Sequence, residues 1–312
     1  MSVSSLSETK AIAREAAVDR AGAGEVSAAD WLLIIVPGFI WGASFLFIAE
    51  GLRVLTPMGV TFTRIIIGFT TLTLVPAARR PIAREDWLGV AALGLLWFAF
   101  PLSMFPFAEQ HVSSALTGML NGATPLFAAT VASLLARRAP SSRVVLGLIV
   151  GLGGAALVAL PTLGSGDSSV RGVLLILAAL VAYGFAINLA RPLQLRNGAL
   201  PVVWRALGVA VLLTAPFGMP AYQHARWALG PWLSLLALGA LGTAIANVMV
   251  ATVAGRAGAT RASTTTLIMP IIALVLGMTV RHEQVAALSI AGGAICLIGA
   301  WLINRPARPA LR

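Results

Sequence analysis

Charged residues are scarce in this chain, and acidic residues are the scarcest. Of 312 residues, 11 are Asp or Glu and 22 are Lys or Arg, whereas 58% are hydrophobic and the mean hydropathy is +0.91. A single soluble core covered by a polar shell cannot take up so much apolar surface. The composition therefore excludes an ordinary soluble domain and predicts an all-α protein embedded in a bilayer.

Cysteine occurs once, at Cys296, inside an apolar stretch. One cysteine excludes an intramolecular disulfide and a cysteine-based metal site. The patterns HExxH and GxSxG, a phosphate-binding P-loop and paired carboxylates do not occur either. We therefore expect no metal, no cofactor and no catalytic residues, and an integral-membrane enzyme is the disfavoured alternative.

Long apolar runs dominate what is present. A membrane span needs roughly 20 apolar residues, and ten runs of about that length predict ten transmembrane helices, at residues 31–49, 57–77, 87–107, 113–136, 143–161, 171–190, 200–219, 231–253, 260–280 and 285–303. Residues 1–30 form a polar tail without the apolar core of a signal peptide, and residues 304–312 form a short basic tail.

The basic residues indicate how the spans are oriented. With the first tail placed in the cytoplasm, sixteen Lys and Arg residues fall on the cytoplasmic side and four on the other side, namely Arg53, Arg171, Arg226 and Arg281. This distribution satisfies the positive-inside rule with both termini in the cytoplasm. Because the charges lie at span ends and form no single patch, they also argue against nucleic acid as a partner. We expect a multi-pass protein of the bacterial inner membrane.

The second half of the chain repeats features of the first. A shift of 145 residues places Pro125 on Pro270, Gly147 on Gly292 and Gly154 on Gly299, in the same order and spacing. Each half then contains five spans, residues 31–161 and 170–303. Since five is odd, the second half must cross the membrane in the opposite orientation, which is the inverted repeat of many secondary transporters.

Two arginines fall inside predicted spans. Arg205 lies near the cytoplasmic end of its span, where snorkelling accounts for it. Arg64 lies seven residues into its span, and an arginine at that depth must pair or face a cavity. We weigh two roles for it: a structural arginine bonded to helix-end carbonyls or to a neighbour such as Glu50, or a ligand or gating contact for a carboxylate.

Uncharged polar and aromatic side chains recur within the spans of both halves. They can serve as hydrogen bonds between helices or, around a cavity, as ligands of a polar solute. The candidate substrate-binding residues are Trp41, Ser44, Trp97, Phe98, Thr117, Asn121, Tyr183, Asn188, Thr243, Asn247 and Thr266. Prolines kink helices, so the candidate gating or structural residues are Arg64, Pro101, Pro125 and Pro270.

The chain resembles the EamA family of the drug/metabolite transporter superfamily, most closely the YddG aromatic-amino-acid exporter group. The resemblance is carried by Trp41-Gly42-x-Ser44-Phe45, Pro57 and Arg64 in the first repeat, and by Gly258-Ala259, Pro270, Glu283 and Gly292 in the second. It implies two inverted five-helix repeats around a central cavity and metabolite export by alternating access. One departure is visible, because Arg138 stands where the family places the first-repeat counterpart of Glu283, which puts a symmetric role for that glutamate in doubt.

These observations together predict a monomeric exporter of small metabolites, above all aromatic and other neutral amino acids, surrounded by membrane lipid. No Asp or Glu falls at the centre of a span, so we expect facilitated diffusion or exchange rather than proton coupling. The alternative is efflux of lipophilic cations by a member of the same superfamily, which Arg64 opposes because it would repel a cation.

Overall fold

Helices account for nearly all of the chain in this computed structural model, which describes residues 27–137, 139–163, 167–257 and 262–304. No strand occurs in those ranges, so the all-α prediction holds for them. Most of both tails, Arg138 and the Gly258-Ala259 motif lie outside the described residues.

The first half contains spans that are interrupted at two places. Its helices are α2 (Ala28–Gly51), α3 (Pro57–Thr73), α4 (Trp87–Leu93), the π-helical turn η3 (Gly94–Ala99), α5 (Phe100–Ala108), α6 (Ser114–Asn121), α7 (Thr124–Ala136) and α8 (Ser142–Leu163), with the short 3-10 turns η1 (Pro76–Arg79) and η2 (Arg84–Asp86). Local sequence sets the helix starts: the side chains of Ser27, Thr56 and Ser113 each accept a backbone N–H of the first turn.

The second half follows the same plan. Its helices are α9 (Asp167–Asn197), α10 (Ala199–Gly218), the 3-10 turn η4 (Met219–His224), α11 (Leu229–Gly239), the π-helical turn η5 (Ala240–Ile245), α12 (Ala246–Ala257), α14 (Thr265–Val280) and α15 (Ala287–Asn304). The turn η5 starts 146 residues after η3, close to the offset read from the sequence. Each half therefore has a π-helical turn at the corresponding place in its third span.

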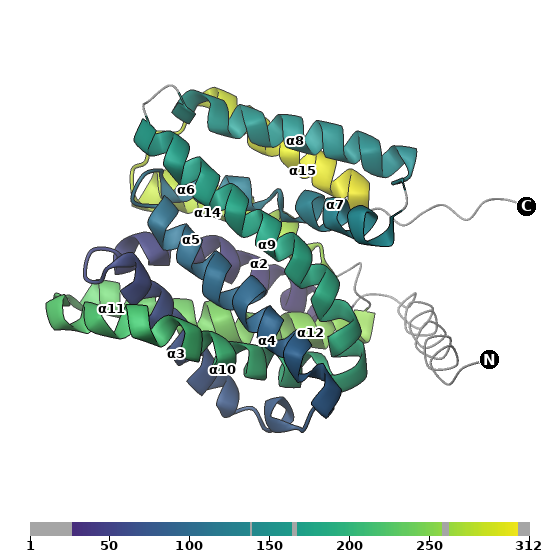
Figure 1. Cartoon of the computed structure of the whole chain (residues 1–312). Helices are drawn as coiled ribbons and strands as arrows, with labels where there is room; N and C mark the ends of the chain where they lie inside the picture. The colour runs from purple at the N-terminus through teal and green to yellow at the C-terminus, as the bar shows by residue number, and fades with distance from the viewer. Residues whose placement is uncertain (1–26, 138, 164–166, 258–261, 305–312) are drawn as a thin grey trace, which may run out of the picture.

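Eight helical segments of the described chain are long and apolar enough to cross a membrane. The two expected spans outside that set correspond to α3, with 17 residues, and α14, with 16. Both still pack against longer helices, α3 on α10 and α14 on α2; all four are labelled in Figure 1. The structure thus supports a multi-pass membrane protein, and the count of ten crossings stays a prediction.

The helix contacts reflect the repeat. The contact of α2 with α14 has its counterpart in that of α9 with α7, and α5 packs on α9 as α11 and α12 pack on α2. In the pairs α3 with α10 and α8 with α15, each helix packs against its own counterpart in the other half. This pattern is what a duplicated five-helix unit produces, and Figure 1 shows the α8–α15 pair along one side of the molecule.

Glycines hold α8 and α15 together at close range. A Cβ on Gly154 would meet the backbone of Cys296, and a Cβ on Gly292 would lie 2.7 Å from the carbonyl oxygen of Gly154. Small residues allow such backbone approach in membrane helices. The glycines that revealed the repeat in the sequence therefore lie at the interface between its two copies.

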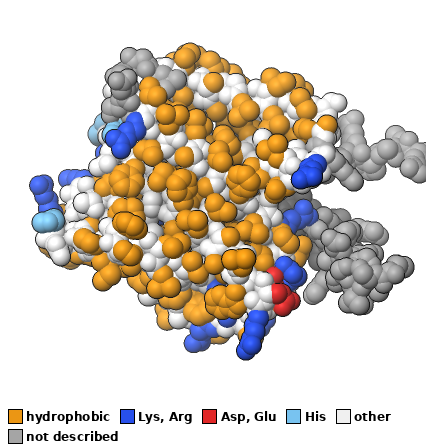
Figure 2. All heavy atoms as spheres, viewed as in Figure 1, with side chains coloured by type: hydrophobic (Ala, Val, Ile, Leu, Met, Phe, Trp, Pro, Cys, Tyr) orange, Lys and Arg blue, Asp and Glu red, His pale blue; other side chains and the backbone are white. Residues whose placement is uncertain are grey.

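The surface has the distribution expected of a bilayer protein. In Figure 2 hydrophobic side chains cover the broad face of the molecule, while Lys and Arg lie toward its ends. Large apolar residues such as Leu88, Leu212 and Ile149 are 83%, 74% and 66% exposed. An exposed apolar surface of this extent is rare on soluble monomers, which agrees with a multi-pass membrane protein.

Candidate functional site

A cavity of about 180 Å³ lies among the helices of both halves. A water molecule needs only about 10–15 Å³ of such space, so the cavity admits a small solute. It is lined by Trp41, Ser44, Phe45, Arg64, Trp97, Phe98, Leu102, Phe105, Asn121, Thr124, Tyr183, Ile187, Gly242, Thr243, Asn247, Thr266 and Met269.

Both π-helical turns contribute to the wall. Trp97 and Phe98 belong to η3, and Gly242 and Thr243 belong to η5. A π turn leaves some backbone groups without their usual helical partners, and such turns are frequent at functional sites. Here the indole Nε1 of Trp41 donates to the carbonyl oxygen of Gly242 at 2.8 Å, which joins α2 to η5 across the cavity.

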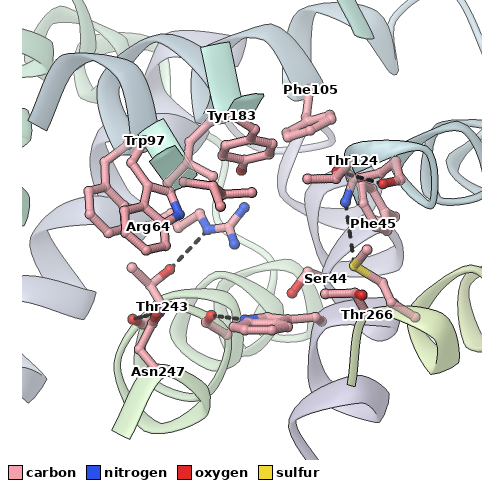
Figure 3. A pocket seen from close by; sticks show the side chains of 17 residues that line it. Ser44, Phe45, Arg64, Trp97, Phe105, Thr124, Tyr183, Thr243, Asn247 and Thr266 are labelled. Atoms are coloured by element: carbon pink, nitrogen blue, oxygen red, sulfur yellow. Dashed lines mark hydrogen bonds between the residues drawn. The ribbon is translucent and has the colours of Figure 1, made fainter. Parts of the chain in front are cut away.

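Among the residues that the structure describes, Arg64 is the only charged one that lines the cavity. It is 8% exposed, and its Nε donates to Oγ1 of Thr243 at 2.9 Å. Figure 3 shows the rest of the guanidinium directed into the space between Tyr183 and Thr243. In the part of the chain that the structure describes, Arg64 makes no other hydrogen bond and no ion pair, so its terminal nitrogens are available to a ligand.

The alternative partner for Arg64, Glu50, lies elsewhere. Glu50 pairs with Arg53 and with Arg281, each at 2.8 Å. The interpretation of Arg64 as a structural arginine bonded to Glu50 is therefore wrong. The other intramembrane arginine, Arg205, has its guanidinium over the rings of Trp87 and Trp204 and is absent from the cavity wall.

Amides and hydroxyls line the rest of the polar wall. The Asn121 amide contacts the sulfur of Met269 at 3.4 Å, and its oxygen lies 3.2 Å from the Thr124 hydroxyl. Nδ2 of Asn247 donates to the backbone carbonyl of Thr243 at 2.8 Å, and its Oδ1 accepts no hydrogen bond from the residues that the structure describes. These groups can replace the hydration shell of a polar solute.

Aromatic side chains close one end of the cavity. Phe105 makes an edge-to-face contact with Phe45 at 5.7 Å between ring centroids and lies 6.0 Å from Tyr183. Trp97 and Phe98, in the turn η3 that precedes α5, stack at 5.7 Å between ring centroids. Aromatic walls of this kind favour a solute with a flat apolar part. We name the contact of Phe45, Phe105 and Tyr183 the aromatic layer.

Most of the candidate substrate-binding residues lie at this cavity, and two of them do not. Thr117 is fully buried, and its hydroxyl donates to Ser113 within α6. Asn188 donates to the backbone oxygens of Ala128 and Gly184, so it joins α9 to α7. The lining residues that sequence reasoning missed are Phe45, Leu102, Phe105, Thr124, Ile187, Gly242 and Met269. Phe45 and Ile187 each lie four residues, about one helical turn, after a predicted residue, Trp41 and Tyr183 respectively. This spacing places them on the same helix face and could have indicated them from the sequence.

The three prolines differ in their local effect. Pro125 is the second residue of α7, just after the break at Gly122 and Ala123, and Pro101 is the second residue of α5, which follows η3. Pro270 lies inside a continuous α14. Their role in gating stays a prediction.

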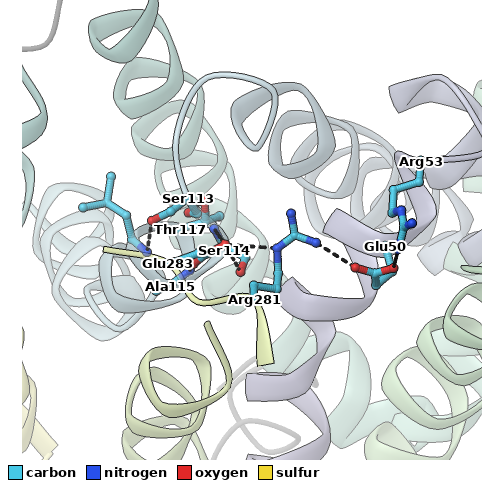
Figure 4. Close-up of polar contacts among 9 residues, drawn as sticks. Glu50, Arg53, Ser113, Ser114, Ala115, Thr117, Arg281 and Glu283 are labelled. Carbon is cyan, nitrogen blue, oxygen red and sulfur yellow. Dashed lines mark hydrogen bonds and ion pairs between the residues drawn. The ribbon is translucent and has the colours of Figure 1, made fainter. Parts of the chain in front are cut away.

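A cluster of charged and polar groups lies beyond the aromatic layer, at the end of the cavity that we name the Glu283 end. Glu283 accepts from the backbone N–H groups of Ser114 and Ala115 at 3.1 and 2.9 Å, at the start of α6 (Figure 4). Arg281 bonds Glu283 at 3.2 Å and Glu50 at 2.8 Å. The cluster therefore ties the end of α14 to α2 and to α6, across the two halves.

A second cluster lies at the opposite end of the bundle. Asp86 is 3% exposed and pairs with Arg196 at 2.6 Å, and it also accepts from Nδ2 of Asn197 at 2.6 Å. Oδ1 of Asn197 in turn accepts the backbone N–H of Ala83 at 2.9 Å. Each end of the bundle thus has polar contacts between the halves.

Glu109 lies at the end of a span, as every acid beyond the tail does, but it is buried there. It follows α5 directly, and both of its carboxyl oxygens are buried without a hydrogen-bond partner in the described chain. Sequence position alone placed it in a loop. Tertiary packing buried it.

A scan against protein families matches the EamA-like transporter family over residues 30–160 and 170–305, which are the two repeats. The chain belongs to the EamA-like transporter family. The resemblance seen in the sequence is confirmed at the level of the family, and the protein is a membrane transporter of a small-molecule substrate rather than an enzyme.

Curated relatives are similar over nearly their whole length. A "Probable terminal-alkyne amino-acid exporter" of Streptantibioticus cattleyicolor is 25% identical over 286 residues, covering 90% of this chain and 95% of that one. The "Uncharacterized transporter YoaV" of Bacillus subtilis is 25% identical, with 86% and 94% covered. A solved crystal structure has a TM-score of 0.60 at 18% identity, covering 89% of this chain and 96% of that chain, and supports the fold alone.

Proposed function

We propose that this EamA-family protein exports amino acids, aromatic and other neutral ones in particular, through the cavity described above. Arg64 carries the proposal, because it presents an unpaired guanidinium to a cavity whose described wall contains no carboxylate. A guanidinium binds a carboxylate with charge-assisted, two-pronged hydrogen bonds. The solute class that fits is therefore one with a carboxylate.

The aromatic wall supports the second half of the assignment. Trp97, Phe98, Phe45 and Tyr183 offer flat apolar surface beside the cation. The polar groups of Asn121, Asn247 and Thr266 remain for an amine or a side-chain hydroxyl. The similarity to a protein named as an amino-acid exporter agrees with this solute class, and membership of the YddG group is part of the proposal.

Ten crossings, in two oppositely oriented sets of five, complete the proposal. The start of α2 and the end of α15 lie on the same side of the molecule in Figure 1, as both-termini-cytoplasmic topology requires. The Glu283 end, with Arg53 and Arg281, then faces away from the cytoplasm. We place the protein in the bacterial inner membrane as a monomer that works by alternating access, one repeat rocking against the other.

Replacement of Arg64 by glutamine tests the function. Purified protein in liposomes takes up a panel of labelled amino acids, and we expect Arg64→Gln to raise the KM for them about 10- to 150-fold, since a hydrogen bond to a charged group contributes about 1.5–3 kcal/mol. Decarboxylated amine analogues should not lose uptake. Arg205→Gln is the matched control, because that arginine lies outside the cavity wall.

Cation efflux is the competing function within the superfamily. It predicts the reverse result: Arg64→Gln would leave or improve the flux of lipophilic cations, and the unsubstituted protein would transport them better than it transports amino acids. The expectation of facilitated diffusion or exchange rested on the lack of a buried acid, and Glu109 removes that premise.

A further inference from the structure

Glu109 lies between the aromatic layer and the polar cluster of the Glu283 end. It is four residues beyond Phe105 on α5, which is a rise of about 6 Å, and Phe105 is part of the aromatic layer. Its charge interacts with those of Glu283, Arg281 and Arg64. Glu109 thus lies about one helical turn beyond a residue of the cavity wall.

No donor of the cluster forms a hydrogen bond with Glu109 in the described chain. Arg281 donates to Glu50 and Glu283, Arg53 donates to Glu50, and the N–H groups of Ser114 and Ala115 donate to Glu283. Both oxygens of Glu109 are buried and unpartnered in the described chain. A buried carboxylate without donors is costly, whereas the neutral acid costs much less.

We propose that Glu109 is a proton-binding site whose proton is released when the Glu283 end opens. In the closed form shown by the structure, Glu109 is a neutral carboxyl. Opening admits water, the carboxyl O–H bond breaks, the proton passes to that water, and the carboxylate is then hydrated. Closing reverses the step. The link to solute transport rests on the proposed function, but proton binding does not depend on which solute is carried.

The electrostatics agree with this geometry. Burial first, and then the neighbouring Glu283 carboxylate, hold the pKa of Glu109 well above its usual range, while Arg281 and Arg64 lower it to a smaller extent. A group whose pKa is higher in the closed form stabilises that form at low pH. The stabilisation is lost as the pH rises through the closed-state pKa.

Other titratable groups lie near the same end and must be separated from Glu109. Glu50 and Glu283 are held by arginines and backbone N–H groups. His111 and His282 belong to the connections after α5 and after α14. A histidine has an unperturbed pKa of about 6.5, so each needs its own control variant.

The test measures opening directly. Spin labels are attached at Gln110→Cys and Gln284→Cys, two exposed positions on opposite halves at this end, in a Cys296→Ala protein. Double electron–electron resonance spectroscopy of the protein in nanodiscs, without solute, measures the distance between the two labels from pH 5 to pH 9. We expect a second, longer distance whose population relative to the short one rises up to about tenfold per pH unit, the limit for one proton.

Variants decide whether Glu109 is the titrating group. Glu109→Gln should hold the short distance at every pH, and Glu109→Asp should restore the titration with a shifted midpoint, which shows that the site tolerates substitution. Glu85→Gln, an exposed acid at the opposite end, should titrate as the unsubstituted protein does.

Three results would overturn the proposal: an unchanged titration in Glu109→Gln, distances independent of pH in every variant, or a titration abolished by His111→Asn or His282→Asn. If amino-acid uptake fails while the distance titration persists, the solute assignment is wrong and the proton site stands.

Discussion

Side chains of one chemical type serve two purposes inside this membrane protein, and only their contacts separate them. The sequence showed Asn188 and Asn247 as amides of similar depth in two spans. The amide of Asn188 donates to a backbone carbonyl of α7. Asn247 donates within its own helix and lines the cavity. Hydrophobic periodicity predicts the spans in which such residues lie. Whether an amide faces the cavity or a neighbouring helix depends on which helix packs against it.

Alanine at these two asparagines should therefore have different effects. Asn188→Ala removes the bond to Ala128 on α7 and should lower the stability of the protein by about 0.6–2 kcal/mol, the range for hydrogen bonds between membrane helices, with KM unchanged. Asn247→Ala should raise KM about 5- to 10-fold, since one uncharged hydrogen bond contributes about 1 kcal/mol. Thermal unfolding in detergent measures stability, and liposome uptake measures KM. A raised KM in Asn188→Ala would show that Asn188 takes part in solute binding.

At the scale of helices, the two halves share their irregularities as well as their spans. The π-helical turns η3 and η5 occur at corresponding places, and both supply cavity residues. No residue pattern identifies a π-helical turn in a sequence. The prolines therefore predicted where helices could be irregular, but the two π turns could not be predicted. The glycines of α8 and α15 could be predicted as packing residues, because a four-residue spacing of small residues brings membrane helices close.

Adjacent glycines of α8 provide a matched test of that packing. A methyl group on Gly154 would meet the backbone of Cys296 and the carbonyl of Gly292, whereas Gly153 has nothing within 4 Å of a Cβ. Gly154→Ala should therefore cost about 1–3 kcal/mol, as overpacking does, and Gly153→Ala should cost nothing. Thermal unfolding in detergent compares the two. Equal stability of both variants would show that α8 and α15 are not packed this closely.

For the whole molecule, composition was sufficient to predict a helical membrane protein, and the resemblance to the EamA family implied a cavity between the two halves. The burial of Glu109 and the pairing of Glu50 with Arg281 could not be predicted, because both depend on how connections far apart in the chain meet. The orientation in the membrane can be predicted from the sequence, because it follows from the charges at the span ends.

Inversion of the halves makes a direct prediction about two corresponding connections. Glu85 lies between the second and third spans of the first half, and Gln223 lies in the same connection of the second half; both are exposed. Cysteines at these positions, placed in a Cys296→Ala protein, should react from opposite sides of the membrane. A membrane-impermeant maleimide applied to intact cells should label Gln223→Cys at once and Glu85→Cys only after permeabilisation. Labelling of both from one side would mean that the repeats are parallel, and parallel halves would leave the Glu283 end without a defined side to which Glu109 could release a proton.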